Sequence, residues 1–408
     1  MKKVLYISYD GLTDPLGQSQ ILPYLVPLAK EGYQFTILSF EKADRFQAEK
    51  DEIRKITDAA NIRWVPLKFT AKPPVLAKIY DRWRMRKTAL RLYRQDKFDM
   101  THCRSYVAAE IGLLLKRRFG TPFLFDMRGF WADEKRDAGT WNQANPFYRW
   151  VYKYYKRKEI EYLQNADQVI SLTEAARREI LTWPGYVPNV SLQVIPCCTD
   201  MELFSLTDRA QKLNARRALA LSDTALVLSY LGSVGTWYML DEMLLLFKRT
   251  KTRFLEAKFL LITQTPGAII ENRILALGLD KRDFLITSAS REKVPVLLKA
   301  SDINVSFIKP VYSKISSCPT KLGEALSVGL PVICNSGIGD VECIVTNANA
   351  GFMIREFSEE DFNEAVEAIP NLLTRSPADI RNSIEPIFGL QRGVGLYQSC
   401  YSKILSDN

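Results

Sequence analysis

The sequence has few of the residues that hold metal ions. Its 408 residues include one histidine, His102, and seven cysteines without a Cys-x-x-Cys pair. Structural zinc sites usually need such paired spacings, so we expect no metal site. An odd number of cysteines scattered along apolar segments is also typical of reduced thiols, which favours a cytoplasmic protein over a disulfide-bonded secreted one.

Long apolar runs are lacking as well. No hydrophobic stretch reaches the roughly 18 residues that a membrane-spanning helix needs. The short apolar run within residues 1–9 leads directly into a turn, which is typical of a strand and not of a signal peptide. The hydrophobic content of 47% is ordinary for a globular protein, and 408 residues are enough for two domains, each with its own core.

Acidic residues are outnumbered by basic ones in only one half of the chain. Residues 1–200 contain 33 Lys and Arg but 23 Asp and Glu, whereas residues 201–408 are neutral. Trp83 and Trp150 lie within the densest basic segments, beside several tyrosines. Basic helices with aromatic residues suit anionic lipid headgroups, so we expect peripheral binding to the inner face of the cytoplasmic membrane. The alternative is a solvated basic face over an ordinary core; nucleic acid is disfavoured, because no recognisable binding motif is present.

Short apolar runs alternate with amphipathic segments along the whole chain, in two successive series. This alternation indicates parallel βαβ units and predicts an α/β protein with two Rossmann-like domains in tandem. We place the N-terminal domain at residues 1–200, the C-terminal domain at 201–388 and a last helix at 389–408. Ligands of such sheets bind beyond the carboxyl ends of the strands, so residues at those ends are the candidate site residues.

Residues 317–335 combine a short helix pattern with a following strand pattern. Pro319 suits the first turn of the helix, Gly329 suits its end, and Ser317 is predicted to be the N-cap. Residues 330–334 are expected to form a buried strand. The N-terminus of such a helix directs several backbone N–H groups at one point, which favours phosphate binding.

Lys321 and Glu324 are three residues apart and therefore share a face of this helix. A cation for a phosphate group then lies beside a carboxylate that accepts hydrogen bonds from a sugar diol. The alternative is a capped surface helix with a chance ion pair.

This stretch resembles the donor-binding signature of retaining glycosyltransferases of family 4. These enzymes have the GT-B fold, in which the active site lies in the cleft between two Rossmann-like domains. In the family, a Glu that contacts the transferred sugar precedes a second Glu, which binds the nucleotide ribose, by eight residues. The second matches Glu324, and the first falls on Ser316. Some members use a Ser-x-Pro-x-Lys version instead, which matches Ser317, Pro319 and Lys321, and the resemblance implies that Ser317, Thr320 and Lys321 bind the donor.

The resemblance extends to the glycine loops of both halves. In the first half it implies that Gly17 approaches the donor phosphates and that Asp14 and Gln20 contact the acceptor. In the second half, Gly232 begins a loop in which many members carry an Arg and a Lys. This chain has Ser233 and the pair Trp237–Tyr238 at those places.

The phosphate charge is then expected to be met by backbone N–H groups, the hydroxyls of Ser233 and Thr236, and Lys321. Arg291 is a further candidate donor-binding residue, because its segment flanks the nucleotide base in the family.

Two strand ends in the first half carry the candidate catalytic residues. Family members place acceptor-side residues after the strand that ends near Asp126, so Asp126 and Arg128 match, and Trp131 is a candidate for stacking on the acceptor sugar. His102 is suited to proton transfer near neutral pH. The alternatives are a hydrogen-bonded histidine at a strand end and a surface pair of Asp126 with Arg128, or of Glu134 with Lys135.

The resemblance implies transfer of a hexose or N-acetylhexosamine from a UDP- or GDP-sugar to a hydroxyl group, with retention of configuration and without a metal or other cofactor. It further implies that the last helix packs back on the first domain. We expect the acceptor to be a lipid-linked saccharide of cell-envelope polysaccharide synthesis. The alternatives are a nucleotide-sugar epimerase of GT-B fold and a non-catalytic partner subunit of a transferase.

Overall fold

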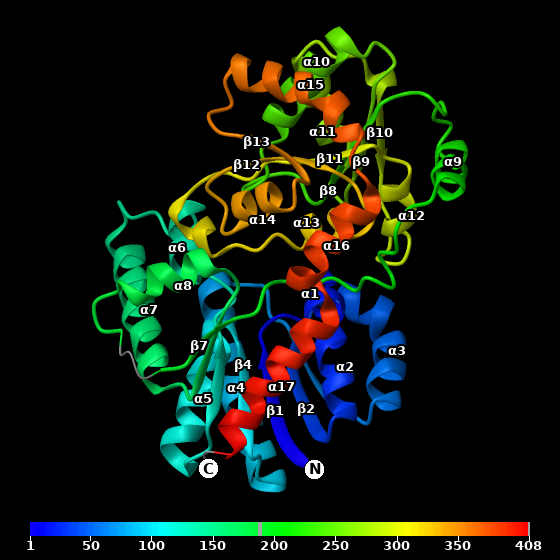
Figure 1. Ribbon diagram of the computed structural model, residues 1–408. Coiled ribbons are helices and arrows are strands. Elements are labelled where there is room, and N and C mark those ends of the chain that lie inside the picture. The colour runs from blue at the N-terminus through cyan, green and yellow to red at the C-terminus, as the bar shows by residue number, and fades with distance from the viewer. Residues whose placement is uncertain (187–189, 407–408) are drawn as a thin grey trace. The chain divides into compact units, whose positions relative to one another are not determined.

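The computed structural model describes residues 1–186 and 190–406 and divides into two compact units. Unit 1 comprises Met1–Pro196 together with Leu390–Asn408, and unit 2 comprises Cys197–Gly389 (Figure 1). The last helix, α17 (Leu390–Ser406), therefore belongs to unit 1, although it follows unit 2 in the sequence.

Within the described residues, unit 1 is built on a seven-stranded parallel sheet in the order β3-β2-β1-β4-β5-β6-β7. The chain runs outward from β1 to β3 and then returns to add β4 on the other side of β1. The strand order therefore reverses between β1 and β4, which is where ligands of such sheets bind. The strands are β1 (Lys2–Ser8), β2 (Tyr33–Glu41), β3 (Arg63–Lys68), β4 (Met100–Arg104), β5 (Phe123–Asp126), β6 (Gln168–Ser171) and β7 (Leu192–Val194).

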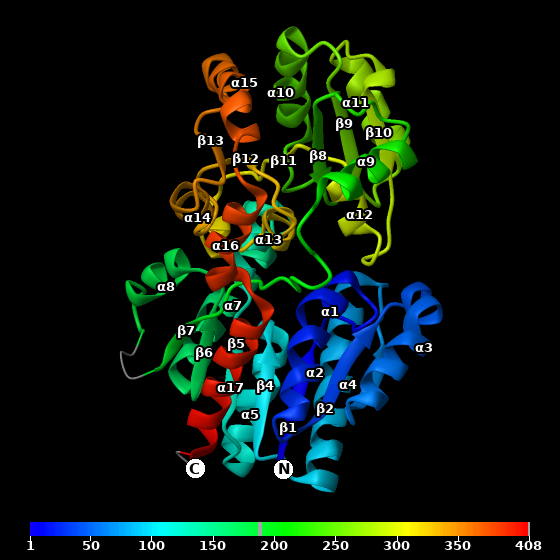
Figure 2. The ribbon, with the colours of Figure 1, turned by 45° about the vertical axis from the view of Figure 1, so that its right-hand side comes forward.

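Helices cover both faces of this sheet, and their apolar sides supply its core. Figures 1 and 2 both show α17 lying beside α2 along the sheet. Buried aromatic residues such as Phe35, Phe123 and Tyr401 fill the space between the sheet and its helices. The other helices of unit 1 are α1 (Pro15–Gln20), α2 (Leu22–Lys30), α3 (Ala43–Ala59), α4 (Pro74–Asp96), α5 (Ser105–Phe119), α6 (Trp131–Asp137), α7 (Pro146–Asn165) and α8 (Glu174–Leu181).

Unit 2 repeats the same plan around a six-stranded parallel sheet in the order β10-β9-β8-β11-β12-β13. Here the reversal lies between β8 and β11. The strands are β8 (Val227–Leu231), β9 (Lys258–Ile262), β10 (Phe284–Thr287), β11 (Ile303–Ser306), β12 (Val332–Asn335) and β13 (Gly351–Ile354).

The helices of unit 2 pack on both faces of this sheet (Figure 2). They are α9 (Arg209–Ala218), α10 (Leu240–Arg253), α11 (Gly267–Ala276), α12 (Val294–Lys299), α13 (Thr320–Ser327), α14 (Val341–Asn347), α15 (Glu359–Leu373) and α16 (Pro377–Phe388), with 3₁₀ turns at Lys281–Asp283 and Tyr312–Ser316. None of the helices in the described ranges combines enough length with enough apolar character to cross a bilayer.

The two Rossmann-like domains predicted from the alternating pattern are confirmed, but the start of the signature helix differs from the prediction. Helix α13 begins at Thr320, and its N-cap residue is Pro319 and not Ser317. Ser317 instead closes the preceding 3₁₀ turn, because its N–H donates to the carbonyl of Lys314 at 3.1 Å. Gly329 follows the helix end with φ +84°, as a glycine in that place should.

Candidate functional site

The glycine loop after β8 is shaped by contact with Lys321. Gly232 has φ +150°, and a Cβ placed there would lie 2.8 Å from the Tyr230 hydroxyl and 3.0 Å from Lys321 Cε. Only a glycine leaves room for the lysine side chain to pass over the loop. The structure thus brings together Gly232 and Lys321, which are far apart in the sequence.

The aromatic pair of this loop contacts two lysines. Lys314 Nζ lies 3.8 Å from the centre of the Trp237 ring, and Lys321 Nζ lies 5.3 Å from the ring centre of Tyr238 and 3.3 Å from its hydroxyl. Aromatic faces attract such cations. The aromatic pair, which stands at one of the two places where many family members carry a cation, therefore contacts cations from other segments. Lys314 was missed, because no local pattern links it to a tryptophan so far away in the sequence.

Glu324 and Arg291, both in unit 2, form a direct ion pair. Arg291 Nη1 lies 3.0 Å from Glu324 Oε1, and Glu324 is 6% exposed. Burial raises the pKa of Glu324 above its ordinary value, although Arg291 and Lys321 oppose the shift. Glu324 is buried and Arg291 is partly exposed, and most of α13 is buried, so the alternative of a capped surface helix does not describe it.

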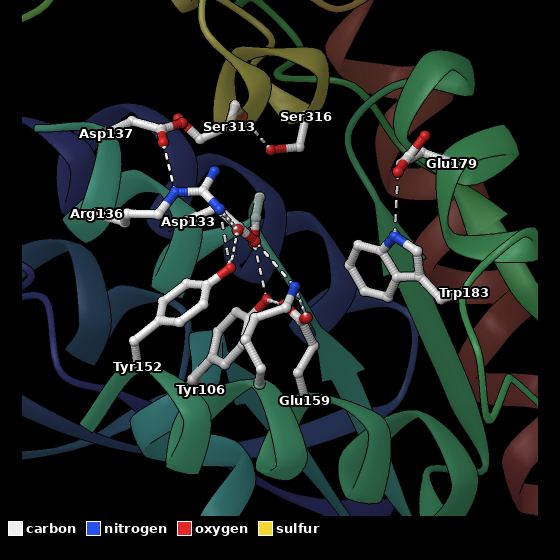
Figure 3. Close-up of polar contacts among 12 residues, drawn as sticks. Tyr106, Asp133, Arg136, Asp137, Tyr152, Glu159, Glu179, Trp183, Ser313 and Ser316 are labelled. Carbon is white, nitrogen blue, oxygen red and sulfur yellow. Dashed lines mark hydrogen bonds and ion pairs between the residues drawn. The ribbon is translucent and has the colours of Figure 1, made fainter. Parts of the chain in front are cut away.

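The candidate serine and threonine residues of unit 2 differ in burial and in hydrogen bonding. Ser316 is buried, and its hydroxyl donates to the carbonyl of Ser313 at 2.7 Å (Figure 3). Ser233 is exposed, and its carbonyl accepts from the Tyr230 hydroxyl at 2.6 Å. Ser317 and Thr320 are half-buried at the approach to α13. Ser316 therefore fixes its own turn in the structure as it stands.

In unit 1, the predicted catalytic residues meet at the carboxyl ends of β4 and β5. His102 Nε2 lies 3.5 Å from Asp126 Oδ2, while the hydroxyl of Tyr397 donates to the same oxygen at 3.1 Å. His102 Nδ1 contacts the Tyr401 hydroxyl at 2.6 Å. Burial lowers the pKa of His102, with smaller contributions from neighbouring arginines, so the ring is neutral.

Two arginines accompany Asp126. Arg128 Nη1 lies 3.8 Å from Asp126 Oδ1, and Arg104 Nη1 lies 3.9 Å from its Oδ2. Burial by itself would raise the pKa of Asp126, but Arg128, His102 and Arg104 reverse the shift and lower it below the usual value. Asp126 is therefore ionised and buried, which overturns the alternative of a surface pair with Arg128. Arg104 was missed by the sequence reasoning, although it ends the strand that contains His102.

Gly17 is packed tightly inside unit 1, and its expected approach to the donor phosphates stays a prediction. It lies inside α1 and is buried, and a Cβ there would meet the Gly11 carbonyl oxygen at 2.2 Å. The glycine is needed for internal packing against the preceding loop. Asp14 precedes the helix and pairs with Lys42 at 2.9 Å and Arg45 at 3.4 Å. Gln20 lies deeper and accepts from Arg128 Nη2 at 3.4 Å, which links it to the Asp126 cluster.

Trp131 begins α6 and packs in an aromatic group. Its ring centre lies 4.8 Å from that of Tyr155, 5.3 Å from Trp141 and 5.7 Å from Tyr106. These contacts fix the orientation of the indole ring.

A charged network lies below this aromatic group. Figure 3 shows Arg136 and Tyr152 pointing toward Asp133, with Tyr106 and Glu159 beside them. Asp133 accepts from the Tyr152 hydroxyl at 2.7 Å and pairs with Arg136 at 3.2 Å, while Tyr106 donates to Glu159. Burial raises the pKa of Glu159 to about 7, although the neighbouring Lys156 and the Tyr106 hydrogen bond oppose the shift.

Comparison with protein families matches nearly the whole chain. Residues 27–203 match the family described as Glycosyltransferase Family 4, and residues 211–377 match the family described as Glycosyl transferases group 1. The chain therefore belongs to the family 4 glycosyltransferases. Its second half is a group 1 glycosyltransferase domain.

Two curated relatives are named D-inositol 3-phosphate glycosyltransferase. The one from Kribbella flavida is 23% identical over 282 residues, which cover 67% of this chain and 63% of the relative. The one from Stackebrandtia nassauensis is 22% identical over 295 residues, which cover 70% and 62%. The chain thus spans slightly less than two thirds of the length of these relatives.

Solved structures similar to this one are glycosyltransferases of the GT-B fold. Sucrose-phosphate synthase from Thermosynechococcus elongatus has a TM-score of 0.75 at 14% identity, with both chains fully covered. Anabaena HepE in complex with UDP-glucose has a TM-score of 0.72 at 13% identity, with 98% of this chain and 100% of that chain covered. WaaG, a glycosyltransferase of lipopolysaccharide biosynthesis, has a TM-score of 0.67 at 15% identity, with 96% and 99% covered. At such identities the similarity shows the fold.

Proposed function

We propose that this protein transfers a hexose or N-acetylhexosamine from a UDP- or GDP-sugar to a hydroxyl group, with retention of configuration. Unit 2 binds the donor and unit 1 binds the acceptor. The observation that carries the proposal is the convergence of Gly232, Lys321 and Glu324 at the carboxyl end of the unit 2 sheet. Family membership supports the reaction class, and the HepE complex with UDP-glucose supports UDP as the carrier.

The donor site has groups suited to the ribose and to the diphosphate of a nucleoside diphosphate. The carboxylate of Glu324, held in place by Arg291, accepts hydrogen bonds from the ribose hydroxyls. Lys321 and the backbone N–H groups after Gly232 bind the diphosphate. As the sugar leaves, negative charge grows on the diphosphate, and fixed positive groups around it lower the barrier. Lys314, lying on Trp237, adds a second cation to this loop.

On the acceptor side, we assign catalytic roles to Asp126, Arg128 and His102. Asp126 is ionised, and the neutral ring of His102 has one nitrogen lone pair, at Nδ1 or at Nε2 according to the tautomer. Either group accepts the proton that the acceptor hydroxyl loses. Arg128 holds the carboxylate of Asp126, and Ser316 is assigned to the transferred sugar.

The acceptor is proposed to be a lipid-linked saccharide reached at a membrane surface. Helix α4 exposes Leu76, Trp83 and other apolar side chains between its basic residues, and α7 exposes Trp150. A pocket of about 310 Å³ between α4, α5 and α7 is lined by the basic residues Arg82, Arg86, Arg117 and Lys158 and by Glu110, which pairs with Arg82. A basic pocket beside exposed aromatic residues suits an anionic headgroup.

The donor assignment is tested by thermal-shift titration with UDP, GDP and their sugars. A ligand at 100 times its Kd adds about 2.7 kcal/mol to the free energy of unfolding. Glu324→Gln should abolish most of this shift, because the amide is a weaker acceptor and no longer pairs with Arg291. The control is Glu342→Gln, which changes an exposed glutamate of the same unit. An unchanged nucleotide shift in Glu324→Gln contradicts the assignment.

Turnover separates the proposal from its alternatives. Consumption of donor that requires an acceptor supports the transferase. Isomerised donor without acceptor identifies an epimerase, and the absence of both reactions with every UDP- and GDP-sugar identifies a non-catalytic subunit.

A further inference from the structure

Arg104 is a buried arginine that hydrogen-bonds Tyr6 but leaves two of its guanidinium nitrogens unsatisfied. It is 3% exposed, and its Nε and Nη1 atoms have no hydrogen-bond partner. The nearest carboxylate oxygens lie 3.5 Å away at Asp10 and 3.9 Å away at Asp126, distances too long for hydrogen bonds. Buried polar groups are normally paired, so two idle donors on one guanidinium require an explanation.

A structural arginine in the same chain behaves differently. Arg216 is also 3% exposed, yet all three of its guanidinium nitrogens are hydrogen-bonded. Nε donates to the Ala300 carbonyl at 3.0 Å, Nη1 to the Asp223 carbonyl at 2.8 Å and Nη2 to Asp302 at 2.6 Å. The fold can therefore satisfy a buried guanidinium where its role is structural, and it does not do so at Arg104.

The surroundings of Arg104 are those of a ligand site. It ends β4 and stands beside the ends of β1 and β5, where the strand order of the unit 1 sheet reverses. Arg128 supplies a second guanidinium to the same carboxylate, Asp126. Both Arg128 and Ser105, the residue after Arg104, have positive φ, at +58° and +66°. Such strained backbone collects at functional sites.

The cluster has a route to solvent and a displaceable counter-ion. The Asp10 side chain is 46% exposed, and its carboxylate faces Arg104 Nε at 3.5 Å. An anion that enters from this side replaces a loose carboxylate contact with direct hydrogen bonds. Asp126 remains as the fixed counter-charge behind the two arginines.

We propose that Arg104 and Arg128 bind a phosphate group carried by the acceptor. A guanidinium donates charge-assisted hydrogen bonds to a phosphate, and the Nε of Arg104, on the side of Asp10, is the unpaired donor that an anion entering there would meet. The inference rests on the proposed function only where it assigns the phosphate group to the acceptor. The site itself belongs to unit 1 and contains none of the residues assigned to the donor.

The test is a thermal-shift titration of the full chain with potassium phosphate, at ionic strength matched with potassium chloride. Arg104→Gln should raise the midpoint phosphate concentration about tenfold or more, because charge-assisted hydrogen bonds are lost. The midpoint for Arg104→Lys should lie between those of the wild type and Arg104→Gln, because an ammonium group keeps the charge but not the planar guanidinium donors. Asp10→Asn should lower the midpoint about threefold, because it removes a competing carboxylate. The control is Arg54→Gln, which changes an exposed arginine of the same unit that lies in neither proposed anion site.

A merely structural Arg104 gives the opposite results. An unchanged midpoint in both Arg104→Lys and Asp10→Asn overturns the proposal, even if Arg104→Gln does not fold. A phosphate response that is absent from the wild type, or that disappears in Lys321→Met and survives in Arg104→Gln, also overturns it. Glycerol 3-phosphate should act at the same site, whereas glycerol should not.

The nucleotide titration keeps this result apart from the proposed function. UDP or GDP should stabilise Arg104→Gln as much as the wild type. If neither nucleotide binds the wild type while the phosphate response follows Arg104, the proposed function fails and the anion site remains.

Discussion

The two units have the same architecture but treat charge differently at the point where the strand order reverses. In unit 2, Lys314 and Lys321 lie on aromatic rings, and Arg291 bonds Glu324 directly at 3.0 Å. In unit 1, Arg104 and Arg128 approach Asp126 only to 3.8–3.9 Å. The charged groups of the unit 2 site are therefore in contact with one another or with aromatic rings, whereas Arg104 in unit 1 keeps two guanidinium nitrogens without a hydrogen-bond partner.

Removal of the Asp126 carboxylate should have the largest effect among the changes that test this difference between the units. Asp126→Asn leaves the buried Arg104 and the partly buried Arg128 without their shared counter-charge and should lower the free energy of unfolding by about 3–5 kcal/mol. Urea unfolding of the variant and the wild type measures the difference. Asp280→Asn, at a fully exposed pair with Arg282, is the control and should change little. A loss below about 1 kcal/mol would mean that the arginines are solvated and not dependent on Asp126.

The pH dependence of unit 1 should come from Glu159, which is buried in the network below the aromatic group. Its pKa rises from 4.5 to about 7 on folding, so the folded state binds the proton more tightly. The stabilisation is therefore complete below about pH 4.5 and is lost as the pH rises through about 7, by on the order of 3 kcal/mol. Urea unfolding between pH 4.5 and 8 measures it.

Two variants of α7 sharpen this prediction. Glu159→Gln should remove the loss of stability between pH 5 and 8. Glu161, on the same helix, has a pKa lowered through Lys158 and Arg117 despite the opposing effect of burial, so its contribution should disappear on acidification instead. The same pH profile in wild type and Glu159→Gln would assign the dependence to another group.

The sequence predicted the frame of both sites better than their contents. The apolar runs are local, so they located the strands and hence the ends at which Asp126 and Gly232 lie. Lys321 and Glu324 were found because three residues span one helix face. Arg104, Lys314 and the true cap of α13 were missed, because each depends on contacts between distant segments or on a preceding turn that no periodicity reveals.

Lys321 tests whether the unit 2 site is organised for a diphosphate. Lys321→Met should weaken binding of a nucleoside diphosphate by about 1.5–3 kcal/mol, because a charge-assisted contact is lost. The bare nucleoside should bind equally well to variant and wild type. Isothermal titration calorimetry measures both ligands, and Lys309→Met changes an exposed lysine of the same unit as a control. Equal losses for nucleoside and diphosphate would make Lys321 a structural residue.

The smallest expected effect concerns the surface charge that separates the units. The basic excess lies in residues 1–200, and Trp83 and Trp150 are 54% and 64% exposed within its densest segments. Each Lys or Arg near an anionic surface contributes about 1 kcal/mol, and salt screens the attraction over about 8–10 Å. Sedimentation with vesicles should therefore show binding to anionic and not neutral lipid, falling as salt rises. Trp83→Ala with Trp150→Ala should weaken it at every salt concentration, because the aromatic contribution is not ionic, whereas Trp237→Ala in unit 2 should not. Negligible binding to both vesicle types at low salt would leave a soluble saccharide as the better acceptor.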